Sequence, residues 1–300
     1  MINEKIDMNE KKNLTLKETF ALAVQNHQKN NLKIAENFYN QVLRVRPNHF
    51  GSIFYLGTLF TQIKRFDAAK SLLQKAIKIK TNYAPAHNNL GGLLKELGEY
   101  EGAVKCCKKA IQIDPHYAEA HNNLGASLRE LGELKKAVDN YQKAIQIQSN
   151  FESAYTNLGA VFQQLGEIHK AINCYEKLKQ IESNPGNAHQ QLGGLYVVLG
   201  DVQKAISAYQ NALKYEADNL VYYYHLIDLK KEILDLDLRN KICRIINDSN
   251  CTKKNLAYGN FLLSKYEKKD KNCKKEFDYL IKGHQHYFET EEEKHKKQVE

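Results

Sequence analysis

Apolar residues along this chain recur at spacings of three and four within blocks of about 14 residues. This spacing is typical of amphipathic helices and differs from the alternation of a half-buried strand. Residues 118–150, for example, contain two such blocks separated by a short polar segment. Because the connecting segments are short, the pattern predicts pairs of antiparallel helices. No strand pattern of useful length accompanies them.

A period of 34 residues organises these blocks. Glycine stands in the middle of the first block of each period, at Gly57, Gly91, Gly125, Gly159 and Gly193. Alanine follows twelve residues after each glycine, at Ala69, Ala103, Ala137, Ala171 and Ala205. Small residues let two helix axes approach closely where they cross. The two blocks of each period are therefore predicted to pack as one hairpin, with glycine and alanine facing each other.

The ends of the blocks carry the residues that helix ends require. A glycine follows the first block at Gly98, Gly132, Gly166 and Gly200, where a left-handed residue needs no Cβ. The four prolines lie at block edges, at Pro47, Pro85, Pro115 and Pro185. None of them interrupts a predicted helix.

These registers resemble the tetratricopeptide repeat. The place of its tryptophan is taken by Ile53, His87, His121, Tyr155 and His189. The resemblance implies an all-α fold, a right-handed superhelical solenoid of antiparallel helix pairs with the first helices on the concave wall. Six repeats are predicted, at 16–49, 50–83, 84–117, 118–151, 152–185 and 186–219.

Outside these repeats the pattern is weaker. Residues 1–15 are a polar segment, and residues 220–249 are expected to form a degenerate repeat or cap. Residues 250–288 are predicted to form an irregular helical hairpin with a lengthened turn near Asp270. The charged tail at 289–300 is expected to be frayed or disordered.

The charge distribution argues against a nucleic-acid partner. The net charge is +9, but most of it lies in residues 1–83, and residues 84–219 are slightly acidic. Lysine far outnumbers arginine, the residue favoured for bidentate phosphate and base contacts. We therefore expect a solvated basic surface and no binding of nucleic acid.

The cysteines and histidines indicate packing. The six cysteines include no C-x-x-C, and they are expected to be small buried hydrophobes in a reducing compartment. A redox pair at Cys106 and Cys107 is the alternative, although neighbours on a helix point about 100° apart. His87, His121 and His189 recur too far apart to share a metal ion, so we expect no metal. The polar start and the absence of long apolar runs predict no membrane span and a cytoplasmic location.

Signatures of catalysis are absent from the sequence. It has no Walker phosphate loop, dinucleotide fingerprint, zinc-protease helix or nucleophile elbow. We therefore expect no enzymatic activity and no cofactor.

A series of amides is the most informative polar feature. Asn89, Asn123, Asn157 and Gln191 precede the Leu-Gly pair in successive repeats. An amide offers a donor and an acceptor, so a ladder of amides suits the backbone of an extended peptide. The alternative is that these amides are satisfied within the array. The full predicted partner-binding groove contains Asn88, Asn89, Lys95, Asn122, Asn123, Arg129, Asn157, Gln163 and Gln191.

The predicted function is a non-catalytic scaffold that binds a peptide segment or partner protein in the groove. The alternative is the amino-terminal repeat region of a larger sulfotransferase or glycosyltransferase, because the array resembles those of sulfotransferases and O-linked N-acetylglucosamine transferases. Related repeats that bind the acidic tails of chaperones carry a lysine and an asparagine one turn apart on a first helix. Here the residues one turn after Asn88 and Asn122 are Gly92 and Ala126, so this positive clamp is missing.

Overall fold

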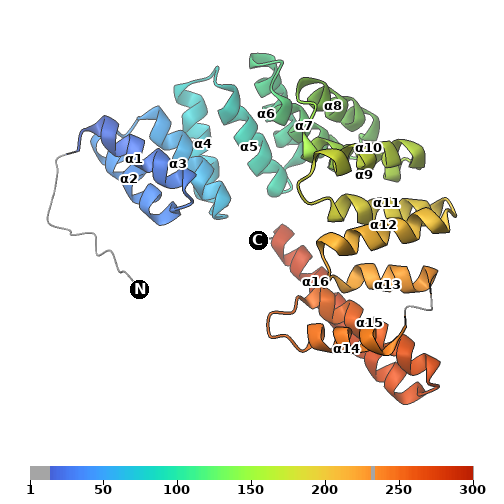
Figure 1. The fold of residues 1–300 in the computed structure, drawn as a ribbon. Coiled ribbons are helices and arrows are strands. Elements are labelled where there is room, and N and C mark those ends of the chain that lie inside the picture. The colour runs from blue at the N-terminus through green and yellow to red at the C-terminus, as the bar shows by residue number, and fades with distance from the viewer. Residues whose placement is uncertain (1–13, 231–233, 300) are drawn as a thin grey trace. The chain divides into compact units, whose positions relative to one another are not determined.

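The computed structural model describes residues 14–230 and 234–299 of the chain (Figure 1). Helices are the regular elements of these residues, and they include no strand. The predicted all-α class is therefore confirmed. The helices divide between two compact units, one ending at Leu131 and the other beginning at Gly132. The polar segment predicted at 1–15 lies almost entirely outside the described residues.

The first unit contains seven helices in its described part. They are α1 (Leu16–Gln28), α2 (Leu32–Val45), α3 (Phe50–Gln62), α4 (Phe66–Ile79), α5 (Ala84–Glu96), α6 (Tyr100–Ile113) and α7 (Ala118–Glu130). Helices α1 and α2, α3 and α4, and α5 and α6 pack as hairpins, and α7 packs on α5 and α6. One apolar cluster runs through the first three hairpins, from Ala23 on α1 to Ala103 on α6.

The second unit contains nine helices in its described part. They are α8 (Leu134–Ile147), α9 (Glu152–Gln164), α10 (Ile168–Ile181), α11 (Gly186–Val198), α12 (Val202–Tyr215), α13 (Leu220–Leu229), α14 (Leu236–Ile246), α15 (Lys253–Lys269) and α16 (Cys273–Val299). Helices α9 and α10, α11 and α12, and α15 and α16 pack as hairpins. The last helices share a separate apolar cluster that joins α13, α14 and α15.

Close contact at the central glycines holds the hairpins together. A Cβ atom at Gly91 would lie 2.6 Å from the sulfur of Cys107 and 3.3 Å from the carbonyl oxygen of Ala103. The prediction that Gly91 and Ala103 face each other is therefore confirmed. At Gly193 the same position is 2.8 Å from the ring of Tyr209, which is buried. The second-helix side chain occupies the space that a first-helix side chain would need.

The turns inside the hairpins also follow the predicted chemistry. Gly98 and Gly200 both have φ of +74°, which is the left-handed conformation expected of a residue that ends a first helix. In the last hairpin the corresponding residue is Lys271, with φ of +56°. The turn there spans only residues 270–272, the same length as residues 29–31 of the first hairpin. The expectation of a lengthened turn near Asp270 is wrong, and the irregularity lies instead in longer helices.

The charged segment beyond residue 288 also differs from expectation. Helix α16 continues through it to Val299, so the predicted fraying is wrong as far as that residue. Glutamate and lysine dominate the segment, and both are strong helix formers. High charge therefore extends the helix here instead of ending it.

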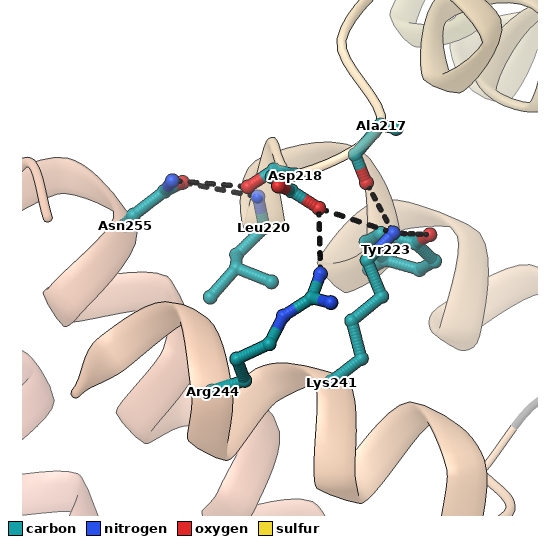
Figure 2. Close-up of polar contacts among 7 residues, drawn as sticks. All are labelled: Ala217, Asp218, Leu220, Tyr223, Lys241, Arg244 and Asn255. Atoms are coloured by element: carbon teal, nitrogen blue, oxygen red, sulfur yellow. Dashed lines mark hydrogen bonds and ion pairs between the residues drawn. The ribbon is translucent and has the colours of Figure 1, made fainter. Parts of the chain in front are cut away.

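Asn255 ties the turn between α12 and α13 to α15 (Figure 2). Its side-chain nitrogen donates to the carbonyl oxygen of Asp218 at 3.0 Å. Its side-chain oxygen accepts from the backbone N–H of Leu220, also at 3.0 Å. One side chain thus forms hydrogen bonds with both a backbone carbonyl and a backbone N–H of the turn.

Lys241 ties the same turn to α14 (Figure 2). It donates to the carbonyl oxygen of Ala217 at 2.7 Å and to the hydroxyl of Tyr223 at 3.0 Å. The carboxylate of Asp218 pairs with Lys241 at 3.3 Å and with Arg244 at 3.6 Å. These contacts fix the last helices of the second unit against α12 and α13.

We expect Gly193→Ala to lower the free energy of unfolding by about 1–3 kcal/mol, because its methyl group would collide with the Tyr209 ring. The matched control is Gly194→Ala, whose Cβ would meet its nearest atom, the Tyr209 hydroxyl, at 3.8 Å. This control should be neutral or stabilising by up to about 1 kcal/mol. Urea denaturation followed by circular dichroism measures both. Equal losses in the two variants would contradict the packing argument.

Acid should destabilise the first unit through His49, which caps α3. Its ring nitrogen Nδ1 accepts from the backbone N–H of Ser52 at 3.2 Å, which requires the neutral ring. Burial lowers the pKa of His49, and the nearby charge of Arg46 lowers it further. The stabilisation is therefore complete above the unfolded pKa of about 6.5 and declines as the pH falls through it.

The variant His49→Asn separates this effect from other titrations, because asparagine caps a helix without titrating. Urea midpoints measured between about pH 7.5 and pH 5.5 should fall less for His49→Asn than for the original chain. An identical fall in both proteins would assign the acid sensitivity to other groups. His49→Ala should cost about 1 kcal/mol at neutral pH.

Candidate functional site

A cavity of about 420 Å³ lies along the first helices of the first unit. We call it the amide cavity, because asparagine side chains from α5 and α7 form part of its wall. Four helices, α3, α4, α5 and α7, and the turn between α3 and α4 contribute to it. Its lining consists of Thr58, Thr61, Gln62, Lys64, Phe66, Asn88, Asn89, Gly92, Leu93, Lys95, Glu96 and Asn123.

A chain of hydrogen bonds links the amides of α5 and α7. Asn123 donates from Nδ2 to Oδ1 of Asn88 at 2.9 Å. Asn88, which is buried, donates in turn to the hydroxyl of Tyr117 at 3.3 Å. Burial raises the pKa of Tyr117, so its hydroxyl stays protonated at neutral pH. Both sides of the Asn88 amide are thus engaged inside the array.

A second amide bridges α5 and α3. Asn89 donates from Nδ2 to the hydroxyl of Thr58 at 3.2 Å, and Thr58 donates to the carbonyl oxygen of Phe54 at 3.0 Å. An asparagine amide has two N–H donors and an oxygen that accepts two bonds. Asn89 and Asn123 each use one donor in these contacts, so each retains hydrogen-bonding capacity at the cavity wall.

The charged residues of the cavity are two lysines and one glutamate. Lys95 lies 3.4 Å from the carboxylate of Glu96, its neighbour on α5. Lys64 stands in the turn after α3, where its φ of +59° places it at the left-handed position. The lining therefore carries a small positive excess beside its amides.

The structure gathers four of the nine predicted groove residues in this cavity, namely Asn88, Asn89, Lys95 and Asn123. Two others lie on α7 outside its lining. Asn122 is half-buried, and Arg129 pairs with Glu130 at 2.6 Å.

The remaining three predicted residues belong to the second unit. Asn157 and Gln163 lie on α9 and Gln191 lies on α11, and all three are half-buried. The side-chain oxygen of Gln163 accepts a hydrogen bond from the hydroxyl of Tyr175 at 2.8 Å. The side-chain oxygen of Gln163 is thus used in a bond between α9 and α10.

Several lining residues were missed from the sequence, among them Thr58, Gln62 and Lys64. The repeat period offered a signal, because Thr58 lies 34 residues before Gly92 and Gln62 lies 34 residues before Glu96. Position within the repeat, and not amide chemistry alone, decides which side chains reach the cavity. Predicting groove residues from amide chemistry therefore identified the asparagines and missed the lining residues of α3.

Two cysteines of α6 and two histidines of first helices contribute to packing and to backbone hydrogen bonds. Burial raises the pKa of Cys107 to about 12 and also raises that of Cys106, so both thiols stay protonated and poorly nucleophilic. His87 donates from Nε2 to the carbonyl oxygen of Thr81 at 2.8 Å, and His121 donates likewise to Pro115 at 3.2 Å. These rings hold the turns that precede their own helices.

Two other kinds of feature, a metal site and a membrane-spanning helix, are absent from the described residues. Within residues 14–230 and 234–299, no group of His, Cys, Asp and Glu side chains is arranged to hold a metal ion. None of the helices in the described part of the chain combines the length and the hydropathy needed to span a bilayer.

Comparison with protein families supports the repeat assignment. A family model described as TPR repeat matches residues 91–129 and 125–166. Another, described as Tetratricopeptide repeat, matches residues 52–83, 152–185 and 186–219. Together these matches span more than half of the chain. The chain belongs to the tetratricopeptide repeat family.

Solved tetratricopeptide structures share the fold at low sequence identity. PilW, a widely conserved type IV pilus biogenesis factor, is 19% identical, with a TM-score of 0.63 over 73% of this chain and 98% of that chain. Pseudomonas aeruginosa PilF is 19% identical, with a TM-score of 0.61 over 72% and 97%. YrrB, described as a TPR protein with an unusual peptide-binding site, is 17% identical, with a TM-score of 0.50 over 62% and 96%.

Among curated proteins, none matches this tetratricopeptide chain. Nothing in the matches above is specific to the arrays of sulfotransferases or O-linked N-acetylglucosamine transferases. That narrower resemblance therefore stays a prediction.

Replacing Asn88 tests the network of the amide cavity. Asn88→Ala should lower the free energy of unfolding by about 1–3 kcal/mol, because its half-buried partners Tyr117 and Asn123 lose their bonds. Asn37→Ala, at an exposed asparagine of α2 in the same unit, is the control and should change stability by less than about 0.5 kcal/mol. Urea denaturation compares them. A loss for Asn88→Ala as small as that of the control would show that the network contributes nothing to folding.

Proposed function

We propose that this tetratricopeptide array is a non-catalytic scaffold that binds an extended peptide segment of a partner protein in the amide cavity. The observation that carries the proposal is the cross-helix bonding of Asn89 to Thr58 and of Asn123 to Asn88. These bonds hold two amides in fixed positions on the wall of a cavity of about 420 Å³. Because the amides are already ordered, a ligand would not have to order them on binding.

The chemistry of the lining suits a peptide backbone. Each amide can donate to a carbonyl and accept from an N–H, whatever the side chains of the ligand. Phe66 and Leu93 supply apolar surface for one ligand side chain, and Lys64 and Lys95 would favour a carboxylate nearby. The ligand class that fits best is therefore an extended segment with an acidic and an apolar residue.

Further support comes from the family. YrrB, which shares the fold, is described as having an unusual peptide-binding site. Burial raises the pKa of the Cys107 thiol, and His87 bonds the carbonyl oxygen of Thr81, so neither residue supplies a reactive group to the amide cavity. The cytoplasmic location stays a prediction from the sequence.

Peptides selected by display against the whole chain provide the probe for this proposal. Isothermal titration should show that Asn89→Ala with Asn123→Ala weakens binding of the selected peptides by about tenfold or more, since each amide contributes about 1 kcal/mol. Asn37→Ala is the matched control and should leave the affinity unchanged. Circular dichroism melting of the double variant would confirm that it is folded.

Two outcomes would contradict the proposal. The first is a display experiment that yields no peptide that binds the chain, and the second is a set of selected peptides that bind the double variant as tightly as the original. Substituting Lys95→Ala should weaken acidic peptides more than neutral ones. Equal effects would remove the carboxylate preference while leaving backbone recognition in place.

A further inference from the structure

Helix α16 carries a row of exposed apolar side chains along one face. Phe277, Ile281 and Phe288 are 63%, 50% and 64% exposed, and His284 stands between the last two. The spacings from Phe277 are four, three and four residues, which is the pattern of a and d positions in a coiled coil. We call these four residues the α16 seam.

The apolar residues of the seam lie to one side of the contact between α16 and α15, and of the four seam residues His284 contacts α15, with its ring centroid 5.0 Å from that of Phe261. The inner face of α16 is marked by Gly283, where a Cβ would lie 2.5 Å from the ring of Phe261 on α15. On a helix with 3.6 residues per turn, the centre of the seam lies more than a third of a turn away from Gly283. Packing on α15 therefore leaves most of the seam uncovered.

Comparison of α16 with α12, the equivalent second helix of an earlier hairpin, indicates what kind of element packs at the seam position of His284. When the turns of the two hairpins are aligned at Gly200 and Lys271, His284 corresponds to Leu213 on α12. Leu213 packs with Val221 and Tyr222 on α13, the next helix along the chain. The part of the seam at His284 thus corresponds to a position through which α12 packs on α13, whereas Ile281 corresponds to Gln210, which is exposed.

Charges at the two ends of the seam select the direction of that helix. Lys274 and Glu292 lie on the same face as the seam, one beyond each end, and both are exposed. They are separated by about 27 Å along the axis, at 1.5 Å per residue. A parallel copy of α16 would place lysine beside lysine and glutamate beside glutamate. An antiparallel copy would place Lys274 beside Glu292 at both ends.

We propose that α16 is a self-association surface that pairs antiparallel with α16 of a second copy of this chain. A two-fold axis near the middle of the seam sets Phe277 against Phe288 of the partner subunit and Ile281 against His284 of the partner subunit. The interface is isologous, so each contact occurs twice. The polar His284 within the seam restricts the register, as single polar residues do in coiled coils.

Sedimentation equilibrium of the full chain, from micromolar to near-millimolar concentration, measures this association. The original chain should form a concentration-dependent dimer, and Ile281→Lys should weaken it by about tenfold or more, because the interface would bury an unpaired charge. Val198→Lys is the matched control: Val198 is 69% exposed on α11, outside the seam, and its substitution should leave the dimer intact. Circular dichroism melting checks that each variant is folded.

A charge exchange tests the direction. Lys274→Glu alone and Glu292→Lys alone should each weaken the dimer through repulsion of like charges, and the double variant should recover the original association. High salt should reduce all these differences.

Three results would overturn the proposal. The first is a chain that stays monomeric over the whole concentration range. The second is a dimer that Ile281→Lys leaves unchanged, which would place the interface elsewhere. The third is a double charge variant that associates no better than the single variants, which would exclude the antiparallel pairing.

Discussion

The missing side chain in the middle of the first helices α3, α5, α9 and α11 is the constraint on which the rest of this structure depends. At Gly57, Gly91, Gly159 and Gly193 the space of a Cβ atom is occupied by the side chain sixteen residues later, which is leucine, cysteine or tyrosine. Because the two helices meet at this point, their axial and rotational positions are fixed together. Every other face of the hairpin, including the one that carries polar residues, is then oriented by that contact.

The asparagine side chains show how close packing at the glycines shapes the amide cavity. With the first helices held side by side, Asn123 reaches Asn88 and Asn89 reaches Thr58 across adjacent helices. The same side chains therefore serve two purposes, since they bond neighbouring repeats together and line a cavity. The two interpretations of the asparagine series, a ligand-binding ladder and an internal network, do not exclude each other. A repeat-stabilising bond can also hold a donor ready for a ligand.

The carboxyl-terminal hairpin departs from the repeat in ways that are physically connected. Its helices are longer, and the turn that precedes α13 is held by Asn255 and Lys241 through several hydrogen bonds (Figure 2). An ion pair between half-buried Arg239 and buried Glu267, at 2.6 Å, joins α14 to α15. These polar contacts add to the small-residue packing that the last hairpin retains at Gly259 and Gly283. The long α16 then exposes Phe277, Ile281 and Phe288 along one side.

The sequence alone determined the class of fold, because glycine, alanine and leucine at a fixed period leave little choice but stacked helical hairpins. It also located the left-handed turn residues, since only a few residue types adopt that conformation at low cost. Which amides meet was decided only by the tertiary structure. Asn88 and Asn123 lie 35 residues apart in the chain, and their contact depends on the rotation of two helices. The length of α16 was also misjudged, because charge was taken as a sign of disorder although glutamate and lysine favour helix. Periodicity can be read directly from one sequence, because it depends only on the order of residues. Contacts between side chains of different repeats depend instead on how the helices pack in three dimensions.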